Sequence, residues 1–155
     1  MEVPEACDSI ECVECKLESM NLLQRIRACW TKAQRGRGIV SRSVLCDDWG
    51  VAQSDWLGDR EIQERLAWDE VDAVFGYKQD CYAVDRICIA LVDSIGRARI
   101  IVSEEDAGYQ VLVGQLPRRL AGCLSADEWF PQVAFPAFKA NPTELCHRAR
   151  KAPFQ

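Results

Sequence analysis

Apolar residues recur at two different periods along the chain, and the change of period divides it into elements. Between residues 19 and 35 they return every three or four positions, which places them on one face of a helix. Ser19 stands where an N-cap residue is expected, and Gly36 and Gly38 follow the last repeat, where helices commonly end. The pattern therefore predicts a helix over residues 19–35.

From Ile39 the period changes to two, which is typical of strands with one buried face. Turn-forming residues at 47–50, 57–59 and 94–96 separate the alternating stretches. The pattern predicts about six strands, over residues 39–46, 51–56, 60–67, 71–80, 86–93 and 97–104. In the fourth stretch we expect one side to carry Val71, Ala73, Phe75 and Tyr77, although Val74 breaks the alternation.

Two further helices are predicted after the strands. Residues 104–106 are acidic and are interpreted as the start of the first, because carboxylates stabilise the positive end of a helix dipole. Gly122 is expected to end it, and Pro117 to kink or interrupt it. Ser125 and Glu128 have the spacing of a capping box and predict a second, short helix.

This order of elements predicts an α+β fold: a mostly antiparallel sheet, or a partly open barrel, with an N-terminal helix and a C-terminal closing helix. We expect residues 1–18 to be a flexible acidic segment and residues 19–155 to form one domain. Residues 131–155 are predicted to be an extended surface tail, anchored by Phe135, Phe138 and Leu145. One core is expected to contain Trp68, Val71, Ile89, Ile101 and Leu112.

Charge is strongly polarised along the chain, whose 155 residues suit a single domain. Residues 19–46 carry six bases and no acid, whereas residues 47–110 carry fifteen acids and six bases. The net charge of −5 argues against general nucleic-acid binding. Met20 begins the first predicted helix and is a candidate start of translation.

Nine cysteines and the absence of a secretory pattern bear on location. The N-terminus is acidic and lacks the apolar core of an export signal, and no apolar run is long enough to span a membrane. We therefore expect a cytoplasmic protein whose cysteines are mostly reduced thiols.

Candidate chemistry is sparse. Cys12 and Cys15 form a C-x-x-C pair, but a zinc site needs a second pair of ligands and a redox motif needs a preceding strand. His147 follows Cys146 in a basic tail, which does not by itself make a catalytic dyad. Lys78, Asp80 and Asp85 are interpreted as a surface ion-pair group around one turn. We predict no catalytic residues, no metal site and no cofactor.

A set of motifs in residues 42–122 resembles a group of small uncharacterised bacterial proteins. The shared plan consists of Trp68-x-x-Val71, Lys78-x-Asp80, Glu104-Glu105-x-x-Gly108 and Leu116-Pro117-x-x-Leu120-x-Gly122. That group is similar in strand order to bacterial pleckstrin-homology-like domains. The resemblance implies a fold used for binding lipids, peptides or proteins, and it supplies no catalytic residues.

Function is left as three hypotheses. The first is a non-enzymatic protein- or peptide-binding module of pleckstrin-homology-like type, of which an acidic binder of a basic partner is a special case. The second is a peripheral membrane protein that inserts the basic helix into an anionic surface, and the third is an enzyme whose site is assembled from scattered residues. The predicted binding residues are those of the basic helix and the residues after it: Arg25, Arg27, Trp30, Lys32, Arg35 and Arg37.

Overall fold

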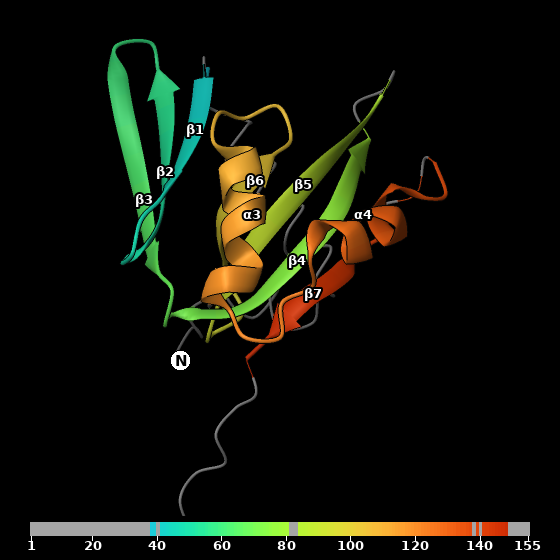
Figure 1. Cartoon of the computed structure of the whole chain (residues 1–155). Coiled ribbons are helices and arrows are strands. Elements are labelled where there is room, and N and C mark those ends of the chain that lie inside the picture. Colours follow the sequence, from blue (N-terminus) through green and yellow to red (C-terminus); the bar gives the residue numbers. More distant parts are fainter. Residues whose placement is uncertain (1–37, 40, 81–83, 138, 140, 149–155) are drawn as a thin grey trace, which may run out of the picture.

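The computed structural model describes residues 38–39, 41–80, 84–137, 139 and 141–148, and of Asp80 the backbone alone. The predicted N-terminal helix and the segment before it lie outside the described residues. The described elements follow the order β1 (Ser41–Cys46), β2 (Gly50–Leu57), β3 (Arg60–Ala67), β4 (Val71–Asp80), β5 (Asp85–Asp93), β6 (Ala98–Ser103), α3 (Tyr109–Arg119), α4 (Ala126–Ala134) and β7 (Thr143–His147) (Figure 1).

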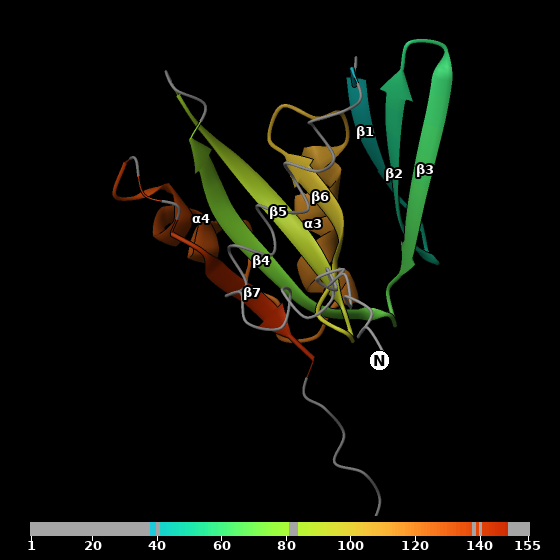
Figure 2. The same cartoon turned by 180° about the vertical axis from the view of Figure 1, so that it is seen from behind.

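The strands form two antiparallel sheets, which confirms the predicted α+β class. One sheet has the order β1-β2-β3 and the other β6-β5-β4-β7. The sheets are open and do not close into a barrel. Helices α3 and α4 both lie against the same face of the four-stranded sheet, and α3 also stands beside β1 (Figure 1). In the view from behind, the opposite face of that sheet is turned toward the viewer and the helices lie behind it (Figure 2).

The two sheets meet along β6, where side chains take the place of a strand-to-strand ladder. Gln53 Oε1 accepts the Ile101 N–H at 3.0 Å, and Arg42 Nη1 donates to the Ile101 carbonyl at 3.2 Å. Asp55 holds Arg42 through two hydrogen bonds of 2.5 and 2.9 Å. The outward N–H and carbonyl of Ile101 on the β6 edge thus find partners without closing the barrel, as buried main-chain groups require.

A β-bulge near the start of β4 reverses the side on which its residues point. The pairing of β4 with β5 shifts register between Val71 and Ala73. As a result Val71 and Val74 both lie in the main core, whereas Phe75 and Tyr77 lie on the other face of the sheet. Our prediction that Val71 shares a side with Phe75 and Tyr77 is wrong, because it assumed unbroken alternation.

The main core lies between the four-stranded sheet, the two helices and the inner face of the small sheet. It contains Trp68, Val71, Ile89 and Leu112, as predicted. Ile101 is not part of it. It belongs to a second cluster with Tyr77, Cys88 and Ala90 on the sheet face turned away from α3 and α4. The strands β5 and β6 are buried on both faces, so apolarity alone does not tell which side a residue takes.

The acidic residues at 104–106 precede helix α3 and do not begin it, which corrects the dipole interpretation. The helix starts at Tyr109, after Gly108, and its first turn contains no acid. Each of the three carboxylates binds a different partner. Glu104 accepts the Ile87 N–H at 3.0 Å, Asp106 accepts the Ser103 N–H at 2.7 Å, and Glu105 pairs with Arg86 at 2.7 Å.

Pro117 lies within α3 and does not interrupt it. The proline occupies the last turn, where the Leu120 N–H still reaches the Leu116 carbonyl at 2.9 Å. The capping box of α4 is formed as predicted: Glu128 accepts the Ser125 N–H at 2.7 Å. No helix among the described residues is long and apolar enough to cross a membrane.

The C-terminal segment is not simply an extended surface tail. It contributes strand β7, which pairs with β4 at the edge of the large sheet. Leu145 is buried in the core, as expected of an anchor, but Phe135 is 71% exposed and anchors nothing. Phe138 lies outside the described residues.

Candidate functional site

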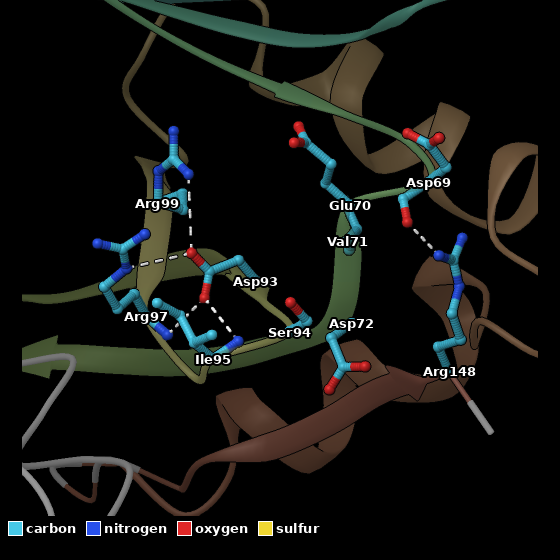
Figure 3. A pocket seen from close by; sticks show the side chains of 10 residues that line it. All are labelled: Asp69, Glu70, Val71, Asp72, Asp93, Ser94, Ile95, Arg97, Arg99 and Arg148. Atoms are coloured by element: carbon cyan, nitrogen blue, oxygen red, sulfur yellow. Dashed lines mark hydrogen bonds and ion pairs between the residues drawn. The ribbon is translucent and has the colours of Figure 1, made fainter. Parts of the chain in front are cut away.

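An open cavity of about 940 Å³ lies where the β3–β4 connection, the β5–β6 turn and the end of β7 converge. Charged side chains dominate its lining (Figure 3). The lining residues are Asp69, Glu70, Val71, Asp72, Asp93, Ser94, Ile95, Arg97, Arg99 and Arg148. The site is therefore assembled from three segments that are distant in sequence.

The β5–β6 turn forms a basic wall organised by one buried carboxylate. Asp93 Oδ1 accepts the backbone N–H groups of Ile95 and Arg97, at 3.1 and 2.9 Å. Its other oxygen lies 3.3 Å from Arg97 Nε and 3.7 Å from Arg99 Nη1. Figure 3 shows both guanidinium groups converging on this carboxylate. Asp93 therefore fixes the turn and neutralises part of the positive charge of Arg97 and Arg99.

A carboxylate of the small sheet also neutralises part of the charge of Arg99. Its Nε donates to Glu64 Oε1 at 2.6 Å, which joins β6 to β3. That hydrogen bond and the charges of Glu64 and Asp93 raise the pKa of the Arg99 guanidinium, so that it stays a cation at any physiological pH. The basic wall is thus largely paired within the chain.

The opposite wall is acidic and largely unpaired. Asp69 and Glu70 are exposed in the turn between β3 and β4, and neither forms an ion pair with another described side chain. Glu70 does accept the Ala67 N–H at 3.0 Å, which holds the turn. Asp72 follows at the β4 bulge, which separates it from the regular alternation of the strand.

Arg148 connects the acidic wall to strand β7. Its guanidinium donates to the backbone carbonyls of Asp69 and Trp68, and its backbone N–H donates to the Asp72 carbonyl. The guanidinium thus binds main-chain oxygens and leaves the Asp69 and Glu70 carboxylates open to solvent (Figure 3). A smaller cavity of about 380 Å³ adjoins this junction and is lined in part by Asp72, His147 and Arg148.

The arrangement suits the binding of a charged segment. The lining carries four acidic and three basic residues. The basic side chains have more hydrogen-bond and ion-pair partners within the protein than the acidic ones do. Exposed carboxylates of this kind attract a cationic ligand over a distance set by ionic strength. Among the described residues, no group of three or more His, Cys, Asp or Glu side chains is placed to hold a metal ion.

Cys146 and His147 do not form a nucleophile–base pair. As neighbours on a strand they point to opposite faces: Cys146 is buried in the core, and His147 is exposed. The imidazole instead lies between two carboxylates, with Nδ1 3.6 Å from Glu144 and Nε2 3.9 Å from Asp72. This contact places His147 at the edge of the smaller cavity.

Lys78 and Asp85 form an ion pair at 3.2 Å, but Lys78 is not at the surface. Lys78 is 4% exposed and also donates to the carbonyls of Ala134 and Pro136, at 3.0 and 2.5 Å. The surface interpretation is wrong for Lys78, because the ammonium group binds the C-terminal end of α4. The side chain of Asp80 lies outside the described residues.

The binding residues predicted from the sequence all lie outside the described residues, as do Cys12 and Cys15. The cavity residues were not predicted. Two signals pointed toward them: the break in alternation at Val74, which reflects the bulge, and the irregular acidic step after Trp68. Neither signal indicates that the β5–β6 turn lies opposite.

Comparison with protein-family models, with curated proteins and with solved structures yields no match for this chain.

Proposed function

We propose that this chain is a non-enzymatic protein- or peptide-binding module, and that a basic segment of its partner docks in the 940 Å³ cavity. The observation that carries the proposal is the unpaired acidic wall: Asp69 and Glu70 are exposed at the rim, whereas the facing arginines are held by Asp93 and Glu64. The cavity therefore offers free negative charge to a ligand. We include in the proposal the pleckstrin-homology-like type expected from the sequence, with which two antiparallel sheets of three and four strands are compatible.

The shape of the site supports a chain segment as ligand. The cavity is open, and its walls come from strand ends and connecting loops at one end of the large sheet, where binding residues often lie. Arg97 and Arg99 can contact acidic or carbonyl groups that flank the basic residues of the partner. Rim charges of this kind mainly accelerate association and set its dependence on salt.

Affinity capture from native cells tests the proposal. The Asp69→Asn/Glu70→Gln double variant removes two charges while keeping shape and the acceptor for the Ala67 N–H. The Asp59→Asn/Glu61→Gln variant removes two charges at the exposed β2–β3 turn, at the other end of β3, and serves as the matched control. We expect a basic protein that the wild type and the control retain and the cavity variant loses. Equal retention by all three would overturn the proposal.

The second candidate is peripheral attachment to an anionic membrane through residues 19–37. The observation that favours it is the run of six bases without an acid in residues 19–46, beside apolar positions at helical spacing. Sedimentation with anionic vesicles at low and moderate salt separates the two candidates. Salt-sensitive sedimentation that the Asp69→Asn/Glu70→Gln variant leaves unchanged supports the membrane candidate.

A further inference from the structure

Two cysteines lie opposite each other where the segment after α3 runs along strand β7. The Leu124 N–H donates to the Leu145 carbonyl at 2.8 Å, which sets these residues side by side. Taking the two segments as antiparallel, one step outward from this hydrogen bond places Cys123 opposite Cys146. Directly opposed antiparallel residues have Cα atoms about 4.5–5.5 Å apart, and a disulfide bond requires about 4.4–6.8 Å.

The side chains of the two cysteines meet as well as their backbones. Both are free thiols, Cys146 is buried in the main core, and Cys123 packs against that core while remaining half-buried. The two thiols interact with each other, and this interaction lowers the pKa of Cys123 and raises the pKa of Cys146. Cys123 is therefore the first of the two to form a thiolate.

We propose that Cys123 and Cys146 are a reversible redox pair, which a low-molecular-weight disulfide such as glutathione disulfide converts into an intramolecular disulfide bond. The proposal is independent of the ligand of the cavity. It rests on the opposed positions of the two residues and on the interaction between their thiols.

The exchange proceeds in two steps. The Cys123 thiolate attacks one sulfur of the small disulfide, forms a mixed disulfide and releases one small thiolate. Cys146 then loses its proton to that thiolate, and its sulfur attacks Cys123 and expels the second small thiolate, which takes a proton from solvent. The protein gives up two electrons and two protons, and one small disulfide becomes two small thiols.

Oxidation would cross-link the segment after α3 to strand β7. The bond would close residues 123–146 into a loop that contains α4 and most of β7. A cross-link over a loop of this size restricts the unfolded chain, so we expect the melting temperature to rise by about 5–10 °C on oxidation. Because Cys146 immediately precedes His147 and Arg148, the bond would also fix the end of β7 that lines the candidate site.

The test equilibrates the full chain in glutathione buffers of increasing oxidised fraction, followed by alkylation, tryptic digestion and mass spectrometry. The cysteines fall in separate peptides, 120–139 and 140–148, since Arg119, Lys139 and Arg148 are cleavage sites. We expect these peptides to become joined while the protein remains folded, and to separate after treatment with a dithiol reductant. Cys46 is the internal control, because burial and the nearby Asp47 raise its pKa to about 11; it should stay a free thiol and be alkylated once the protein is denatured.

Single variants test the order of the steps. Cys146→Ser should trap Cys123 as a glutathione mixed disulfide, because the resolving thiol is missing. Cys123→Ser should slow the modification of Cys146 by about tenfold or more, since Cys146 is buried and its thiolate forms less readily. If the wild-type peptides never join in the folded protein, or join only after denaturation, the proposal is overturned. Joining of Cys123 to other cysteines as readily as to Cys146 would also overturn it.

Discussion

Gln53 binds the backbone N–H of Ile101 through its side-chain oxygen, at 3.0 Å, and so joins the two sheets across an edge that none of the described strands covers. Both residues are buried. The Gln53 amide nitrogen in turn lies 3.3 Å from both oxygens of Asp55, which also holds Arg42. One glutamine therefore links the edge strand of the large sheet to an ion pair of the small one.

Replacing this glutamine should weaken the junction. Gln53→Ala leaves the buried Ile101 N–H without its acceptor, and we expect a loss of roughly 1–3 kcal/mol in the free energy of unfolding. Denaturant unfolding measures the loss, and hydrogen exchange should show faster exchange at the Ile101 amide. Gln63→Ala is the control: Gln63 is exposed, and its contact to Ser54 is long, at 3.4 Å. An unchanged Ile101 exchange rate in Gln53→Ala would contradict the assignment.

Gly108 fixes the start of α3 against β1 and should not tolerate a side chain. Its φ is +90°, and an added Cβ would lie 1.9 Å from the Val44 carbonyl oxygen. The neighbouring Ala107 carbonyl accepts the Val44 N–H at 2.8 Å, so the two backbones cannot separate freely. We expect Gly108→Ala to cost roughly 3 kcal/mol or more, measured by denaturant unfolding.

Gly114 provides a matched control in the same helix. An added Cβ at Gly114 meets nothing within 4 Å, and the residue is exposed. Gly114→Ala should raise stability by roughly 0.5–1 kcal/mol, because alanine favours the helix. Similar effects of the two substitutions would show that the contact between Gly108 and Val44 does not control the helix start.

The capping box predicts a specific dependence on pH. The backbone N–H of Ser125, and then its hydroxyl, bind the Glu128 carboxylate and lower its pKa. A carboxyl whose folded pKa lies below its unfolded value of about 4.3 stabilises the fold above that value. This contribution is lost as the pH falls through the folded pKa.

NMR titration of the Glu128 side chain measures this pKa directly. We expect a value below about 4.3 in the wild type. Ser125→Ala removes the hydroxyl and keeps the backbone donor, so the pKa should rise only part of the way toward its ordinary value. A wild-type pKa at or above the ordinary value would contradict the capping interaction.

Much of the fold follows from local patterns. The alternation near β1, β2 and β3 and the turns between them predict the small sheet, and the Ser125–Glu128 spacing predicts the start of α4. These features are recognisable because each depends on residues close in sequence. The α+β class follows from their order.

The remaining features depend on long-range contacts. Strand β7 lies in a proline-rich stretch and acquires its strand geometry by pairing with β4. The β4 bulge changes the face on which Phe75 and Tyr77 lie. The break in alternation at Val74 marks an irregularity in the sequence, but the pairing with β5 is needed to place the bulge. The cavity joins the turn after β3 to the turn after β5, and nothing in either segment specifies that they face each other.

Hydrogen exchange of the chain with and without its captured partner tests the central claim most directly. If a basic segment docks in the cavity, backbone amides at 69–72 and 94–99 gain protection in the complex. The gain should fall as salt is raised, because exposed carboxylates steer the encounter. Protection confined to residues 19–37, or to the β2–β3 turn, with the cavity amides unchanged, would contradict the account.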